Sequence, residues 1–394
     1  MANLIARWHQ SLNEIPEHHW EDLVGNHINP FFRWKWLSAL ETSNSICARQ
    51  GWQPLHLVLW REETPIAVAP LYLKAHSYGE FVFDQVFARL AEELSLNYYP
   101  KLIGMSPLSP VEGYRFFYAQ NENTQELTNL MMETIDRFAI SNGINSCNFL
   151  YVDSAWRELA EATNCARWVN QKSLWLAEGS KSFSEYLKKF NSNQRRNIKR
   201  ERKAVENAGV KVEVITGDQI NKPIMELMHN FYEQHCARWG AWGSKYLSKN
   251  FFEELSTPGL KNYLVLFNAH QHDSKDPIAM SLCIKDRNML WGRYWGSKKE
   301  IDCLHFEVCY YSPISWALKQ GITHFDPGAG GSHKRRRGFI AQENISLHRW
   351  YDKRMDTLIR PWLKKVNKIM ALEIESQNNE LPFRIDAPTL SAKN

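Results

Sequence analysis

The sequence lacks paired cysteines and any apolar run long enough to cross a membrane. Its seven cysteines are scattered and form no Cys-x-x-Cys pair, which argues against a disulfide framework or a structural zinc site and suits reduced thiols in a core. One of the longest apolar runs, Pro65–Leu73, is far shorter than the ~18 residues of a spanning helix. The first residues, MANLIARWHQ, contain no apolar stretch typical of a secretory signal. We therefore expect a cytoplasmic protein without a transmembrane segment.

The chain also lacks a strong charge imbalance, since its formal net charge is only +5 over 394 residues. With 44% hydrophobic and 13% aromatic residues, disorder and a coiled coil are poor interpretations. The positive charge is concentrated in Gln194–Lys203 and in Lys334–Arg337. Neither a Walker loop nor a dinucleotide-binding glycine motif is present. These features favour a local contact with a polyanion over a nucleic-acid coat across the whole surface.

Two parts of the sequence resemble each other. His56–Lys74 and Tyr263–Lys285 both contain Leu-Val-Leu, a polar turn, Pro-Ile-Ala and an apolar stretch that ends in Lys. Each reads as a β-hairpin. A strand-like segment follows each hairpin, at Glu80–Phe83 and at Met289–Trp295. The pattern predicts two copies of one α+β unit with a meandering sheet, the alternative being chance similarity between two hairpins.

The ends of the helices support this repeat. In each half a helical stretch ends at Gly-Ile, at Gly143 and at Gly321, where glycine can close a helix in the left-handed conformation. Near the boundary, Ser182 is placed to cap a short helix. A basic helix is then predicted from Gln194 to about Ala208. We expect an N-terminal domain of residues 1–180 and a C-terminal domain of residues 181–394.

The segment His76–Asp84, HSYGEFVFD, gathers an imidazole and two carboxylates around one glycine. In an extended conformation Glu80 and Asp84 would share a face. Such a group could supply a general base or bind a substrate ammonium, although solvated charges at a strand edge are an equal alternative. The following motif Tyr98–Leu102, YYPKL, could form a wall of a cleft or only a surface crossover.

Three segments of the second half carry further candidates. In Trp291–Lys299 the glycines allow close backbone approach, and lysines precede a helix expected near Asp302, which suits a phosphate. In Leu304–Gln320 Glu307 is a candidate base beside Tyr310, although a structural hydrogen-bonded role is the more common one. Pro313 predicts a kink or a new first helical turn. In Phe325–Phe339 a glycine bend leads into four cations and suits phosphate or carboxylate binding.

Taken in order, six motifs resemble one family. HSYGEFVFD, YYPKL, SNQRRNIKRERK, GRYWG, LHFEVCYY and DPGAGGSHKRRRGF are similar to those of the bacterial FemAB-like predicted N-acyltransferases of the GNAT superfamily. The resemblance covers about residues 31–350. It implies an α+β fold of tandem GNAT-like domains, each with a mixed central sheet flanked by helices. It also implies transfer of an acyl or aminoacyl group to an amine, as in Fem-type enzymes that build peptidoglycan cross-bridges. Lys298 stands where the GNAT pyrophosphate signature has a small residue.

The leading hypothesis is an N-acyltransferase that uses acyl-coenzyme A or aminoacyl-tRNA as donor substrate and an amine, for example a cell-wall precursor, as acceptor. No tightly bound cofactor and no metal are expected, and tRNA is a candidate partner. A carboxylate base would contribute ~10²–10⁴-fold. The alternatives are a non-catalytic nucleic-acid-binding protein that uses clusters 195–203 and 334–337, and an inactive scaffold.

The candidate residues fall into three groups. The catalytic candidates are Glu307, Asp84, His76 and Tyr310, with Glu307 or Asp84 as the base. The candidates for holding the donor are Arg293, Gly296, Lys298, His333, Lys334 and Arg337. The candidates for contacting the substrate are Glu80, Tyr99, Lys101 and Asp326.

Overall fold

The computed structural model describes residues 4–26, 28–240 and 243–384. The chain forms two compact units. Unit 1 comprises residues 1–170, 246–254 and 343–371, and unit 2 comprises residues 171–245, 255–342 and 372–394. Four elements have residues in both ranges: β9 (Ala166–Leu176), α9 (Lys249–Leu255), β15 (Ile340–Trp350) and α12 (Lys353–Asn379).

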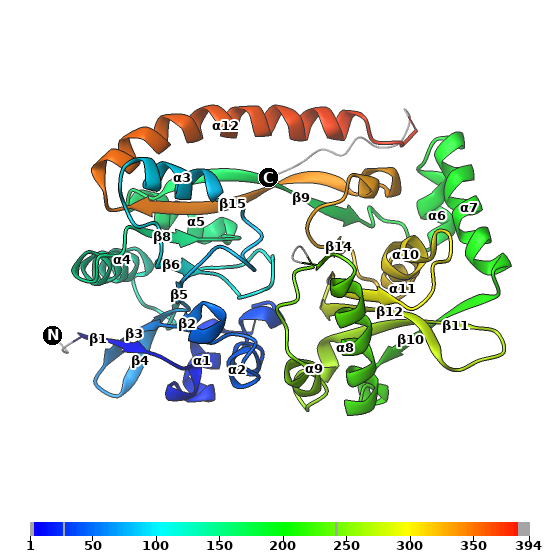
Figure 1. Ribbon diagram of the computed structural model, residues 1–394, viewed down its shortest axis with the longest axis horizontal. Helices are drawn as coiled ribbons and strands as arrows, with labels where there is room; N and C mark the ends of the chain where they lie inside the picture. Colours follow the sequence, from blue (N-terminus) through cyan, green and yellow to red (C-terminus); the bar gives the residue numbers. More distant parts are fainter. Residues whose placement is uncertain (1–3, 27, 241–242, 385–394) are drawn as a thin grey trace. The chain divides into compact units, whose positions relative to one another are not determined.

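Unit 1 contains two sheets. Its strands are β1 (Leu4–His9), β2 (Trp52–Pro54), β3 (His56–Arg61), β4 (Thr64–Ala69), β5 (Tyr72–Lys74), β6 (Lys101–Gly104), β7 (Phe117–Tyr118) and β8 (Ser146–Phe149). Strands β1, β3, β4 and β7 pair antiparallel in that order. In the second sheet β6 is parallel to β8 and antiparallel to β5, and β5 is antiparallel to β2. The helices are α1 (Glu17–Val24), α2 (Trp34–Thr42), α3 (Gln85–Glu93), α4 (Thr124–Ser141) and α5 (Ser154–Ala162) (Figure 1).

Unit 2 is built on one mixed sheet. Its strands are β10 (Val210–Thr216), β11 (Leu264–Gln271), β12 (Pro277–Asp286), β13 (Met289–Ser297) and β14 (His324–Asp326). Strands β10 to β13 form an antiparallel meander, β14 is parallel to β13, and β9 is antiparallel to β14. The helices are α6 (Phe183–Lys188), α7 (Ser192–Asn207), α8 (Lys222–Ala237), α10 (Leu304–Phe306) and α11 (Ser312–Lys319) (Figure 1). The α+β class with mixed sheets and flanking helices is confirmed.

Both hairpins of the predicted repeat are present. Strands β3 and β4 form the first, and β11 and β12 form the second. Gly143 and Gly321 adopt φ values of 66° and 73° after α4 and α11, so each closes its helix in the left-handed region. The strand predicted at 289–295 is β13. The strand predicted at 80–83 is wrong, since these residues form an irregular loop in which Phe81 has φ of 57°.

Ser182 caps a short helix as predicted, whereas the basic helix begins at Ser192 instead of the predicted Gln194. The Ser182 side chain accepts a hydrogen bond from the Glu185 amide at the start of α6, and the Asn191 side chain accepts one from the Gln194 amide at the start of α7. Each satisfies an amide that the first helical turn leaves without a carbonyl partner. Near Pro313 the backbone makes a π-helical turn over Glu307–Tyr311 before α11 begins at Ser312. A proline is tolerated there because the first turn needs no amide donor from it.

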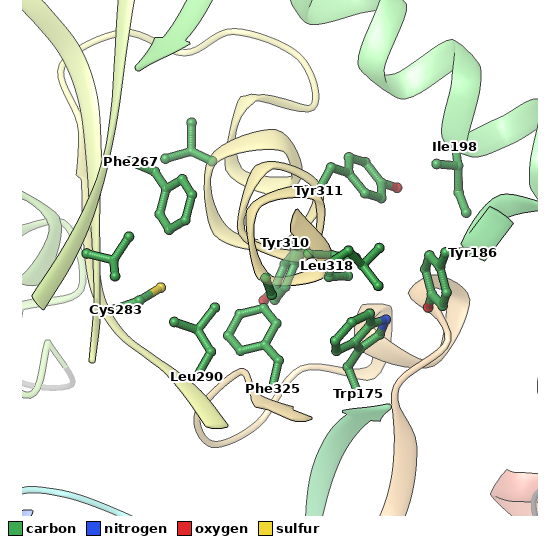
Figure 2. Close-up of a cluster of buried hydrophobic side chains, with 14 of the residues drawn as sticks. Trp175, Tyr186, Ile198, Phe267, Cys283, Leu290, Tyr310, Tyr311, Leu318 and Phe325 are labelled. Carbon is green, nitrogen blue, oxygen red and sulfur yellow. The ribbon is translucent and has the colours of Figure 1, made fainter. Parts of the chain in front are cut away.

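A core of buried apolar side chains holds unit 2 together. Figure 2 shows its central members, including Trp175, Phe267 and Phe325, gathered between the sheet and the helices. Their side chains are completely buried, and each such residue contributes about 1.5–3 kcal/mol on burial. Four of the seven cysteines are buried and three are half-buried, all as free thiols. Among the described residues, no helix is both long and apolar enough for a bilayer crossing.

Candidate functional site

Two buried lysines stand side by side in unit 1. Lys74 ends β5 and is the antiparallel partner of Lys101, which begins β6. Both side chains are completely buried. Like charges directly opposite each other on two strands repel, and buried charges are retained only when they are paired. The loop between the two strands supplies the required carboxylates.

Lys101 is the centre of a buried ion-pair network. Its ammonium donates to Glu80 Oε2 at 2.8 Å, to Ser77 Oγ at 2.8 Å and to Asp84 Oδ2. The Tyr98 hydroxyl also donates to Asp84 Oδ2, at 2.6 Å. Glu80 and Asp84 are both almost fully buried. We call Lys74, Ser77, Glu80, Asp84, Tyr98 and Lys101 the lysine-carboxylate network.

Each carboxylate of this network keeps one oxygen without a partner. Glu80 Oε1 and Asp84 Oδ1 are buried and accept no hydrogen bond from any described residue. Burial raises the pKa of Glu80 to about 7 in spite of Lys101. Burial tends to raise the pKa of Asp84 as well, but the charge and hydrogen bond of Lys101 hold this pKa below its usual value. The two carboxylates thus differ in basicity, a pattern typical of acid-base sites.

Lys74 lies at the edge of the network. Burial lowers its pKa to about 7. Its ammonium lies 3.7 Å from the centre of the Trp52 ring and donates to the Tyr78 carbonyl at 3.1 Å. It is also 3.3 Å from His76 Nδ1, and burial together with Lys74 lowers the pKa of this histidine. Tyr99 reaches the network through its hydroxyl, which is 2.7 Å from Ser77 Oγ.

The structure therefore brings together all five predicted residues of unit 1. They are His76, Glu80, Asp84, Tyr99 and Lys101. His76, Glu80 and Asp84 come from the irregular loop before α3, for which Asp84 is the N-cap position, whereas Tyr99 and Lys101 come from the segment that leads into β6. Sequence reasoning missed Lys74, Ser77 and Tyr98. The sequence did contain a signal for Lys74, which is the lysine at the end of the apolar stretch of the repeat. Once such a strand is buried, its lysine is shielded from water and needs a partner of opposite charge.

In unit 2 the predicted residues around β13 contact one another. A register shift in the pairing of β12 with β13 makes Arg293 the extra residue of a bulge, a feature common beside active sites. Its guanidinium is paired with Asp326 at 3.0 Å. Asp326 also accepts the Gly328 amide at 2.8 Å, and Lys334 donates to the Gly328 carbonyl at 2.7 Å. Burial lowers the pKa of Lys334 to about 8.

A second set surrounds the π-helical turn. The Tyr310 hydroxyl lies 2.9 Å from His333 Nε2. Arg337 is paired with Glu201 at 2.7 Å and stacks on the Phe306 ring at 3.4 Å. Burial, followed by the charge of Arg337, lowers the pKa of His333, so this histidine is biased towards its neutral form.

Glu307 is held on both oxygens. Arg202 donates to Oε1 and Oε2 at 3.0 Å each, and the Ser312 hydroxyl donates to Oε1 at 2.8 Å. Bidentate hydrogen bonds between an arginine and a carboxylate are among the stronger side-chain contacts in proteins, and they fix the orientation of both groups. This geometry is the one expected for a structural carboxylate.

The two remaining candidates lie at the end of β13. A Cβ atom on Gly296 would meet the Phe231 carbonyl oxygen of α8 at 2.1 Å, so the space beside this glycine is occupied by protein backbone. Lys298 is exposed, with its ammonium 5.0 Å from the centre of the Phe231 ring.

No group of three or more His, Cys, Asp or Glu side chains suited to a metal ion occurs in the described part of the chain.

Comparison with known proteins places this chain in a family. No curated protein sequence matches it. Among solved structures, FemX aligns with 12% identity over 91% of this chain and 100% of that chain, with a TM-score of 0.50, a likeness of fold. L-PGS from Bacillus licheniformis aligns with 8% identity over 84% of this chain and 95% of that chain, with a TM-score of 0.48. The FemAB-like family, described as peptidoglycan biosynthesis/recognition, matches residues 11–385. The chain therefore belongs to the FemAB-like family.

Proposed function

We propose that this protein is an N-acyltransferase that moves an acyl or aminoacyl group from an activated donor to an amine of a peptidoglycan precursor. The observation that carries the proposal is the lysine-carboxylate network of unit 1, in a chain that belongs to a peptidoglycan biosynthesis/recognition family. Four buried charged side chains are expensive to keep in a core, and such groups are typical of functional sites.

In the proposed reaction the amine loses a proton to a carboxylate while its nitrogen attacks the acyl carbonyl carbon. The new C–N bond replaces the C–O bond of an aminoacyl ester or the C–S bond of a thioester, and the leaving group takes up a proton. A base works best when its pKa lies near the operating pH. Of the carboxylates considered, Glu80 fits best, because its pKa is about 7 and Oε1 has no partner among the described residues.

Replacement of the three carboxylates tests this assignment. Glu80→Gln should lower kcat by about 10²–10⁴-fold, the usual contribution of a general base. Glu307→Gln should keep most of the activity, since its carboxylate is already engaged by Arg202 and Ser312. The kcat of Asp84→Asn should lie between the values of these two variants. Product formation with a peptidoglycan precursor is followed by mass spectrometry, with thermal unfolding as the control for folding. Full activity in all three variants would remove the network from the mechanism.

The donor is proposed to be acyl-coenzyme A or aminoacyl-tRNA. Arg196 and Arg200 on α7 are exposed and have no ion-pair or hydrogen-bond partner in the described structure, which supports a polyanionic donor. With tRNA, activity should fall steeply with salt, and the double variant Arg196→Gln/Arg200→Gln should reduce the slope by about two. Activity with acyl-coenzyme A that is insensitive to salt would exclude the tRNA version.

A further inference from the structure

A groove of about 460 Å³ in unit 2 is lined by residues of α6, α7, β10 and the π-helical turn. This volume is typical of small-molecule sites. The groove belongs to unit 2, whereas the lysine-carboxylate network belongs to unit 1. The residues of α6, α7 and β10 that line it have no part in the proposed transfer reaction.

The floor of the groove is apolar. Leu187, Val205 and Val210 are buried in the core below it, while Phe183 and Val212 are only half-buried. Apolar side chains of this kind bind an apolar group because the contact removes apolar surface of both partners from water. The floor alone would not distinguish one apolar ligand from another.

The rim of the groove carries positive charge. Lys199, Arg202, Lys203 and Glu206 lie on one face of α7, at the i, i+3, i+4 and i+7 spacing of a helix. Arg202 is paired with Glu307 and stacks over Phe183 at 4.5 Å, and Lys203 is 3.1 Å from Glu206. Lys199 is exposed and has no partner in the described part of the chain. One unneutralised cation therefore remains, at the edge of an apolar floor.

We propose that this groove binds an amphiphilic anion, in which one phosphate or carboxylate is joined to a short aliphatic chain. The chain would cover Phe183 and Val212, and the anion would be bound by Lys199. A simple phosphate would leave the floor unused, and an uncharged amphiphile would leave Lys199 unpaired. This binding goes beyond the proposed transfer reaction and can be measured without donor or acceptor.

Calorimetric titration with butyl, hexyl and octyl phosphate tests the combination of charge and chain. Affinity should rise about twofold to fourfold for each methylene group, as the chain leaves water. Inorganic phosphate and octyl glucoside, which each carry only one of the two features, should bind much more weakly than octyl phosphate. An affinity that does not depend on chain length, or equal binding of octyl glucoside, would overturn the proposal.

Matched variants locate the anion. Lys199→Gln should weaken octyl phosphate binding by about tenfold, the scale of one charge-assisted contact. Lys211→Gln removes an exposed lysine of β10 that does not line the groove and should leave binding unchanged. Unfolding midpoints of both variants check the fold. Equal losses in the two variants, or no loss in Lys199→Gln, would refute the site.

The source of the ligand is decided with vesicles. Binding to phosphatidylglycerol vesicles, but not to phosphatidylcholine vesicles, that is lost in Lys199→Gln would identify a membrane lipid. Binding of octyl phosphate without vesicle binding would identify a soluble amphiphile. Vesicle binding without any affinity for octyl phosphate would mean that α7 recognises a charged surface and that the groove is not a site.

Discussion

At the scale of single residues, the main feature is a set of charges placed where water cannot reach them. Lys101 is completely buried yet has three polar partners, Ser77, Glu80 and Asp84. Each partner is supplied by the loop that precedes α3. The charges are therefore maintained by one another, and loss of the central cation should affect the whole group.

Lys101→Met is expected to destabilise the protein by about 3–5 kcal/mol, because it leaves two carboxylates buried without their cation. Urea unfolding gives the free energy. Lys35→Gln serves as the control, since Lys35 forms an exposed ion pair with Glu17 at 3.6 Å and such pairs contribute about 0–1 kcal/mol. A similar loss of unfolding free energy in the two variants would show that Lys101 does not stabilise the network.

The pH dependence of stability should report Glu80. Its pKa rises from 4.5 to about 7 on folding, so the folded state binds more protons than the unfolded state between these values. Stability relative to Glu80→Gln should therefore decrease as pH rises from 4.5 to 7 and level off above 7. Urea unfolding of both proteins at several pH values measures this difference. A difference that is constant with pH would contradict the raised pKa.

At the scale of elements, close packing of α8 on β13 explains why residue 296 is a glycine, although the sequence suggested that this glycine contacts a ligand. Gly296 of β13 lies against the backbone of α8 at Phe231. At Gly292 of the same strand, the nearest atoms to the position of a Cβ belong to the Phe325 ring, the closest at 3.2 Å. A ring can adjust by a few tenths of an ångström, whereas the backbone of a packed helix cannot.

Gly296→Ala should therefore cost about 1–3 kcal/mol from overpacking, and Gly292→Ala distinctly less. The two free energies of unfolding are compared under identical conditions. If Gly296→Ala is as stable as the wild type but loses transfer activity, the glycine acts on a ligand and the packing explanation is wrong.

At the scale of the whole molecule, a compact unit is not the same as a continuous stretch of chain. Unit 1 takes in residues 343–371 as well as the first 170 residues. In that late segment Leu347–Trp350 pairs with Phe149–Ser146 of β8, and Arg349 forms an ion pair with Asp136. The Trp350 ring also packs against Phe87.

A fragment of residues 1–180 should therefore fail to fold by itself, because β8 and its surroundings lose these partners. Circular dichroism and urea titration should show no cooperative transition. Addition of residues 343–371 through a flexible Gly/Ser linker should increase ordered secondary structure. A cooperative transition in the 1–180 fragment alone would show that the later segment is dispensable for unit 1.

The sequence by itself determined features that depend on near neighbours in the chain. The hairpins, the cap at Ser182 and the glycine at the end of α4 follow from alternation, side-chain caps and left-handed backbone. The family was also evident from its motifs, and the match over residues 11–385 confirms it.

Only the tertiary structure decided which charges meet. Lys74 and Lys101 become neighbours through the pairing of β5 with β6, and Arg202 reaches Glu307 from a helix more than 100 residues earlier (|i−j| = 105). A charged side chain in water loses little free energy when it has no partner. A buried charge without a partner, in contrast, destabilises the folded state strongly. The partners of Glu307 and Lys101 therefore follow from burial, which no local pattern encodes.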